Sequence, residues 1–351
     1  MSWLESVKGC LRDINENGRV FPKGSRIEMV FVVVAQNHLL LRTEGPGDIN
    51  MARLYKGGIE VPIIMSQKFN AVVRRRMLQL LRDFRDKNVD KMSEYVKEAS
   101  KLGFKKANVG DGSKWNCTIQ PPIAESGKKS TDIGMDGYCP ACSIFGVALT
   151  EQELSINEMQ KQKRPFSVGI RSRVRFDPAF ATTRSIVTQT HNKVTEGELS
   201  TTGQSLFNEI HVEPGTTFIG RMVVTDVTEP ELKAILYSLF TTEEIGGRSR
   251  IYGTIRVKPL GIRCGAYSAT TAYELASEGA NQENQENIES FLKEKLNANG
   301  FKELKEEDIT PQDINKLFED LWESSLDFSK QVVDWIRKLV SKQTDATHGE
   351  Q

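Results

Sequence analysis

Three cysteines form the clearest metal-binding pattern in the sequence. Cys139 and Cys142 are separated by two residues, a spacing that lets both thiolates reach one tetrahedral Zn²⁺, and Cys117 can supply a third ligand. The fourth ligand stays open among His191, His38, His211 and a carboxylate, and we carry His191 forward as the candidate. The alternative is three buried free thiols. The surrounding segment has little apolar content with which to fold unaided, and this favours a structural zinc site.

The other two cysteines, Cys10 and Cys264, have no partner at metal-ligand spacing, so we interpret them as ordinary small core or surface residues. Clustering of the remaining three indicates metal binding rather than disulfides, as expected in a reducing compartment. The longest apolar run, Met29–Ala35, is far too short to cross a bilayer, and the first residues lack a signal-peptide pattern. The sequence therefore predicts a cytoplasmic protein without a membrane partner.

A glycine-rich basic loop lies between an apolar helix and an alternating strand, within Ile245–Val257. Glycines 246, 247 and 253 let the main chain approach a ligand closely, while Arg248 and Arg250 offer planar forks of donors that match a phosphate. The alternative is a helix C-cap turn with solvated arginines.

Two further basic elements point to the same chemistry. Ser66 can cap a helix whose first turns carry basic side chains, and arginines at alternating positions share one side of a strand within Phe166–Phe176. Alone, each is also explained as a solvated basic face. Together with the glycine-rich loop they predict an RNA-binding surface. The candidate contacts are Ser66, Lys68, Asn70, Arg74, Arg75, Arg171, Arg173, Arg184, Arg248 and Arg250.

Charge is distributed unevenly along the chain, although Lys and Arg (47) balance Asp and Glu (47) overall. From Glu278 to the end there are 9 basic and 17 acidic residues, so this part carries −8 and the preceding body +8. A basic body fits a polyanionic partner. Signatures of catalysis are missing: there is no P-loop, His-Glu-x-x-His or Gly-x-Ser-x-Gly. We therefore expect no enzymatic activity, with Asp48 in the loop Gly45–Asn50 as the alternative catalytic residue.

The order of predicted elements indicates an α+β fold. Strands are expected at Ile27–Thr43, Phe166–Phe176, Thr217–Val227 and Ile251–Val257, and helices begin at Ser66 and Glu229. This β-α-β-β-α-β order is the ferredoxin-like plan shared by RNA-recognition motifs.

Three segments do not fit that core and are predicted to be additions to it. The core comprises residues 1–100 and 146–279; residues 101–145 form a cysteine-containing zinc insertion, and residues 181–205 form a projecting hairpin or loop within the core. Residues 280–351 form a helical segment in which two helices are expected, packed on the body or on a neighbouring subunit.

These motifs resemble the RAMP superfamily of CRISPR-associated proteins, specifically the backbone subunit of type I-D effector complexes, over Ile27–Tyr267. Val61–Arg74 resembles the family's stretch that opens the first helix and touches guide RNA. Gly246–Gly253 resembles the superfamily's glycine-rich loop, and Tyr138–Gly146 resembles the cysteine-phenylalanine-glycine block of this subgroup. The resemblance implies that several copies assemble along one CRISPR RNA, together with other effector subunits. The 181–205 insertion would be a thumb folding over the guide.

The resemblance also implies how sequence is read. The protein would hold the phosphate and ribose of the guide, and the exposed bases would pair with target DNA or RNA. Related subunits of type III complexes cut target RNA with a loop aspartate, which is the reason to keep RNA cleavage by Asp48 and a divalent metal as the alternative.

Overall fold

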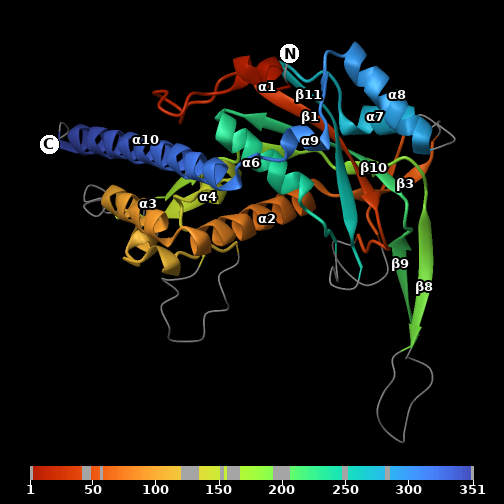
Figure 1. Cartoon of the computed structure of the whole chain (residues 1–351), viewed down its shortest axis with the longest axis horizontal. Helices are drawn as coiled ribbons and strands as arrows, with labels where there is room; N and C mark the ends of the chain where they lie inside the picture. The colour runs from red at the N-terminus through yellow and green to blue at the C-terminus, as the bar shows by residue number, and fades with distance from the viewer. Residues whose placement is uncertain are drawn as a thin grey trace, which may run out of the picture.

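A computed structural model describes residues 3–41, 49–55, 58–119, 134–150, 154–155, 167–192, 206–246, 252–280 and 285–348 (Figure 1). The chain has an α+β fold built on an eight-stranded sheet with the order β12-β11-β1-β10-β7-β3-β2, in which β6 also pairs with β10. The strands are β1 (Arg26–Ala35), β2 (Met51–Arg53), β3 (Glu60–Ile64), β6 (Val174–Phe176), β7 (Ala179–Ala181), β10 (Thr217–Thr225), β11 (Ile255–Gly265) and β12 (Lys302–Glu303).

Strand β1 is the centre of this sheet. It pairs antiparallel with β10 on one side and β11 on the other. Successive side chains of a strand point to opposite faces, and every residue from Ile27 to Val33 is buried, so both faces of the sheet are covered at β1. The β-branched run Val32–Val34 suits this pleated, buried position.

Helices pack on the sheet and on one another. α2 (Ser66–Lys87) contacts α6 (Glu229–Phe240), while α7 (Ala272–Gly279) contacts β10, and α8 (Gln285–Ala298) and α1 (Trp3–Val7) contact β11. α10 (Ile314–His348) packs along α6, α3 (Val89–Leu102) and α4 (Pro140–Phe145). The remaining short helical elements are η1 (Lys8–Cys10), η2 (Lys105–Ala107), η3 (Gly112–Lys114) and α9 (Glu306–Ile309).

Two hairpins lie outside the main sheet. β4 (Val147–Thr150) pairs with β5 (Ser167–Ile170), and β8 (Ile186–Asn192) pairs with β9 (Leu206–Val212). Figure 1 shows β8 and β9 projecting away from the body as a long arm. A projecting hairpin or loop was expected at residues 181–205; that range contains β8 but not β9, which begins at Leu206 and ends at Val212.

Three expectations about the elements need correction. The predicted strand Phe166–Phe176 is two strands, β5 and β6, because the chain leaves the extended conformation between them and β6 joins a different sheet. The two expected C-terminal helices are one helix, α10, since nothing between them breaks the helix. β1 ends at Ala35, before the predicted end of that strand at Thr43. Among the described residues, no helix combines the length and apolarity needed to cross a membrane.

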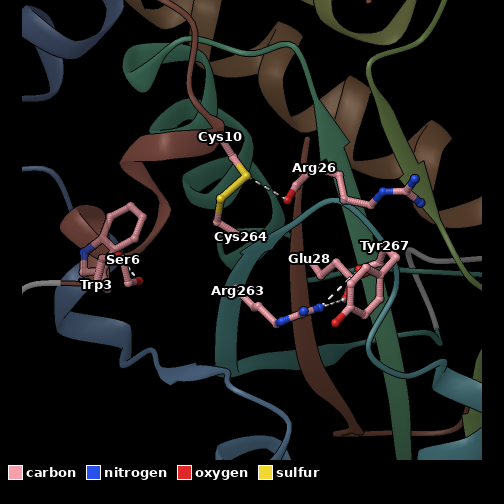
Figure 2. Close-up of a disulfide and its surroundings, with 8 residues drawn as sticks. All are labelled: Trp3, Ser6, Cys10, Arg26, Glu28, Arg263, Cys264 and Tyr267. Carbon is pink, nitrogen blue, oxygen red and sulfur yellow. Dashed lines mark hydrogen bonds and ion pairs between the residues drawn. A yellow bond between two sulfur atoms is a disulfide. The ribbon is translucent and has the colours of Figure 1, made fainter. Parts of the chain in front are cut away.

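The expectation for Cys10 and Cys264 was also wrong. The two cysteines, which lie far apart in the sequence, form a disulfide between the end of η1 and strand β11 (Figure 2). Their spacing along the chain holds no sign of this, because only the folding of the first residues across β11 brings them together.

Candidate metal centre and nucleic-acid interface

A buried cluster of four metal-ligating side chains lies beside α2. The ligand atoms of Cys117, Asp136, Cys139 and Cys142 all lie within 4.8 Å of one another, and all four residues are buried. Sγ of Cys117 and Sγ of Cys142 are 3.6 Å apart. The structure thus brings together the three cysteines that the spacing singled out.

The fourth residue of the cluster is Asp136, not His191. The expectation for His191 has to be corrected: it lies in hairpin strand β8, paired with Phe207, while His38 and His211 form a separate ring contact. A carboxylate was among the open alternatives. The available signal was the regular spacing of Asp136, Cys139 and Cys142, each three residues from the next.

Hydrogen bonds from three neighbouring groups fix the orientation of the Asp136 carboxylate. Oδ1 accepts hydrogen bonds from the backbone N–H groups of Tyr138 (3.1 Å) and Cys139 (3.0 Å), and Oδ2 accepts one from Nε1 of Trp115 (2.7 Å). Burial, followed by the nearby Cys142, raises the pKa of Asp136 to about 7. Burial also raises the pKa of the Cys139 thiol well above its usual range. A bound cation would reverse this and favour the ionised forms.

The donor set fits a structural metal ion. Three thiols and one carboxylate give four ligands, the number of a closed tetrahedral zinc site, and their burial leaves no open position for substrate. Gly137 is needed between Asp136 and the first cysteine of the pair: its φ is +87°, and a Cβ there would lie 2.4 Å from Cδ2 of Leu149.

Arginines on one face of α2 hold the metal-binding segment in place. Arg74 donates to the carbonyl of Gly146 (3.0 Å), Arg82 to that of Cys117 (2.8 Å) and Arg85 to that of Trp115 (2.6 Å). Their positions along α2 repeat at helical spacing, so they form one stripe. The expectation that Arg74 contacts RNA is therefore at odds with its position, since its second amino group also lies 3.6 Å from Sγ of Cys142.

The next residue, Arg75, lies on a different face of α2 and is exposed. Its Nε donates to the Ala71 carbonyl one turn back (3.1 Å), and no ion pair of Arg75 occurs within the described part of the chain. Arg75 lines a hollow of about 260 Å³ together with Arg76 and Gly246. The α2 helix thus meets Gly246, the first residue of the predicted glycine-rich loop, at one site.

That hollow also contains acceptors. Glu243 and Glu244 line it from the segment after α6, and Nε of Arg76 donates to Oγ1 of Thr241 (3.0 Å). Gly246 cannot be replaced without strain, because its φ is +104° and a Cβ would lie 2.8 Å from the Leu40 carbonyl oxygen.

The third basic element lies elsewhere and is largely structural. Arg173 is 3 % exposed and its two amino groups donate to the carboxylate of Glu231, both at 2.8 Å. Arg171 is more exposed but is ion-paired with Asp226. The prediction that Arg173 contacts RNA needs correction, because its guanidinium is enclosed by protein.

The remaining predicted contacts are placed as follows. Ser66 is the first residue of α2, but the N-cap is Met65, and no side chain caps this end. Lys68 is half-buried, and burial lowers its pKa. Oδ1 of Asn70 is buried without a hydrogen-bond partner among the described residues, and Arg184 is exposed just before β8. Outside the described residues lie Asp48, Arg248 and Arg250.

Comparison with known proteins assigns the family. A family model described as Csc2 Crispr matches residues 12–350, and the chain belongs to this Csc2 family of CRISPR proteins. The crystal structure of Thermofilum pendens Csc2 is 49% identical over 97% of this chain and 98% of that chain, with a TM-score of 0.77. No curated protein matches.

Two other solved structures match far more weakly. One is described as "CRISPR RNA-guided surveillance complex, pre-nicking" (13% identity, 68% of this chain and 75% of that chain, TM-score 0.37) and one as "Type IV-B CRISPR Complex" (13%, 67% and 90%, 0.35). These similarities are too low to inform fold or function.

The family resemblance drawn from the motifs has to be corrected accordingly. In place of the RAMP backbone subunits of type I-D complexes, matched over Ile27–Tyr267, the family is Csc2 and the match runs over residues 12–350. The C-terminal helix α10, which had been left outside the resemblance, lies within the matched residues, and it packs on α3, α4 and α6.

Proposed function

We propose that this Csc2 protein binds CRISPR RNA as a repeated backbone subunit of an antiviral effector complex and presents the guide for pairing with target DNA or RNA. The observation that carries the proposal is the hollow where Arg75 of α2 meets Gly246 of the glycine-rich loop. It joins an arginine with no acidic ion-pair partner among the described residues to a glycine, which has no side chain to keep a ligand away from the backbone. These are the features that suit a phosphate backbone.

The topology supports the same proposal. The strand order β11-β1-β10-β6, with α2 and α6 packed together, is what a ferredoxin-like β-α-β-β-α-β core requires. RNA-recognition motifs share this plan. The β8–β9 arm projects from this core (Figure 1). In the proposed complex this arm folds over the guide as a thumb.

Within the hollow, we assign complementary roles to the two kinds of side chain. Arg75 donates to phosphate oxygens, while the carboxylates of Glu243 and Glu244 accept hydrogen bonds from ribose 2′-hydroxyl groups. The acidic side chains would disfavour phosphate on their own side, so the RNA strand follows the arginine side. Base edges stay free to pair, and the protein itself reads little sequence.

We assign the Cys117, Asp136, Cys139 and Cys142 cluster to a structural Zn²⁺, which supplies crosslinking of the segment rather than chemistry. It holds that segment against the stripe of Arg74, Arg82 and Arg85 on α2. Arg75 and Arg76 extend from other faces of the same helix. By fixing the opposite side of α2, the metal-binding segment therefore holds in place the helix that carries the proposed RNA interface.

The role we propose is non-catalytic. Cleavage by Asp48 is the alternative from the sequence, and it is tested by supplying Mg²⁺ to the assembled complex with a matching target RNA. Uncut RNA supports the scaffold role; periodic cuts that vanish in Asp48→Ala, with RNA binding retained, would replace it with an endonuclease.

The RNA-binding proposal is tested with Arg75→Ala, using fluorescence anisotropy of two unrelated single-stranded RNAs. Loss of one charge-assisted phosphate contact is expected to weaken both by roughly tenfold and to lower the salt slope by about one. Arg256→Ala is the matched control, because Arg256 is exposed but paired with Glu306. Equal affinities for wild type and Arg75→Ala would rule out this interface.

A further inference from the structure

The Cys10–Cys264 disulfide fixes the start of an N-terminal segment, residues 10–23, on strand β11. From there this segment contacts Val227, just before α6, and then helix α10. Cα atoms of the two residues are 5.8 Å apart, and Sγ of Cys10 lies 3.2 Å from the Arg26 carbonyl oxygen (Figure 2). Cys10 is buried, whereas Cys264 is partly exposed near the end of β11. Because Cys264 is only partly buried, we take its side of the bond as the side from which a small thiol in solution attacks.

Residues 10–23, which we call the N-terminal strap, continue from this bond. The backbone N–H of Arg12 donates to the carbonyl of Val227 (2.9 Å), and its guanidinium pairs with Asp226. Further along, Arg19 donates to the carbonyl of Ser324 in α10 (2.9 Å) and pairs with Glu231. The backbone N–H of Lys23 also donates to Oδ1 of Asp226 (2.7 Å), and Gln331 of α10 hydrogen-bonds the backbone of Glu16 and Arg19. Of these attachments, only the disulfide depends on redox state.

The strap forms the walls of two cavities. Residues 19–22 line a hollow of about 230 Å³ with Arg171 and Trp335. Residues 12–14 line a groove of about 1000 Å³ beside α6, α9 and the start of α10. The disulfide at Cys10 lies two residues before the groove-lining residues 12–14, which the Arg12 contacts with Val227 and Asp226 also hold in place.

We propose that the cysteine pair is a redox-reversible covalent modification site, with a small-molecule disulfide such as oxidised glutathione as its oxidant. In the forward direction two protein S–H bonds and the S–S bond of the oxidant break. One protein S–S bond and two S–H bonds on the leaving thiols form, so protons and electrons balance. Reduced glutathione reverses the step. The oxidised form fixes the strap covalently on β11; the reduced form leaves it held by its hydrogen bonds and ion pairs, chiefly those of Arg12 and Arg19.

This inference departs from the usual state of cysteines in a reducing compartment, where disulfides are rare outside redox-sensing and thermophilic proteins. It does not depend on the proposed RNA binding. The bond closes a chain segment of 254 residues, and a crosslink across so long a segment removes much of the conformational freedom of the unfolded chain. Its reduction is therefore expected to lower Tm measurably.

The first test equilibrates the full-length, metal-loaded protein in glutathione buffers of increasing oxidised fraction, traps free thiols with an alkylating agent and maps them by mass spectrometry. Alkylation of Cys10 and Cys264 is expected to fall together as the buffer becomes more oxidising and to return on reversal. Two thiols that stay alkylated in every buffer would overturn the proposal.

The second test separates the bond from side effects of reductant on the metal site. In wild type, adding a phosphine reductant is expected to lower Tm by about 5 °C and to speed tryptic cleavage after the exposed Lys23. In Cys264→Ser the same reductant should change neither. A wild-type Tm and cleavage rate that ignore reductant, or a Cys264→Ser protein that responds equally, would overturn the proposal.

Discussion

Replacing Glu231 by Gln should destabilise the protein more than any surface charge change. Glu231 is fully buried at the start of α6, where it pairs with Arg19 and Arg173. It also accepts the backbone N–H of Thr228 (2.9 Å), which completes a capping box. Both arginines lie over the ring of Phe328, and Arg19 ties the strap to α10. The carboxylate therefore neutralises two enclosed guanidinium groups at the junction of three segments.

The size of the effect follows from the pKa of Glu231. Burial alone would raise it, but Arg173 and Arg19 outweigh burial and lower the pKa to about 2, from an ordinary value of 4.5. That difference corresponds to roughly 3 kcal/mol of stability. Removing one partner of a buried ion pair typically costs about 3–5 kcal/mol, and the value from the pKa of Glu231 lies within this range. Because the folded pKa lies below the ordinary value, this contribution is complete above pH 4.5 and is lost as the pH falls towards 2.

The assay is chemical denaturation of wild type and Glu231→Gln between pH 7 and pH 4. The difference in free energy of unfolding should be about 3 kcal/mol at pH 7 and should start to shrink below pH 4.5. Glu229→Gln is the matched control in the same helical turn. Its exposed pair with Lys233 contributes at most about 1 kcal/mol. A loss at pH 7 no larger for Glu231→Gln than for Glu229→Gln would refute this account.

Three further outcomes are expected. Asp136→Asn should weaken zinc binding at least about tenfold in competition with a chromophoric chelator, whereas Asp111→Asn, outside the cluster, should not; equal affinities would remove Asp136 from the ligand set. Gly246→Ala should cost about 1–3 kcal/mol in thermal denaturation, because it needs positive φ and meets the Leu40 carbonyl, whereas Gly9→Ala, with open space around it, should stay within about 0.5 kcal/mol. Arg74→Met should lower Tm while leaving RNA affinity per folded molecule unchanged, as judged by anisotropy; a selective loss of RNA binding would return Arg74 to the interface.

The elements with strong local patterns could be predicted. The apolar run of β1, the helical spacing of α2 and the acid-and-proline start of α6 are each encoded within a few neighbouring residues, so hydrophobic periodicity and capping chemistry located them. The two-residue spacing of Cys139 and Cys142 likewise reports on ligand geometry without any tertiary information.

The tertiary structure alone decided which partner each polar side chain meets. Arg74 and Arg75 are adjacent in sequence, yet one supports the metal-binding segment and the other lines the open hollow, because neighbours on a helix point about 100° apart. Arg173 faces Glu231 and Cys10 faces Cys264 across long sequence separations. No pattern among neighbouring residues of the sequence predicts such pairs. They arise when packing of the sheet and helices brings distant segments together, and burial then makes each charge require a partner.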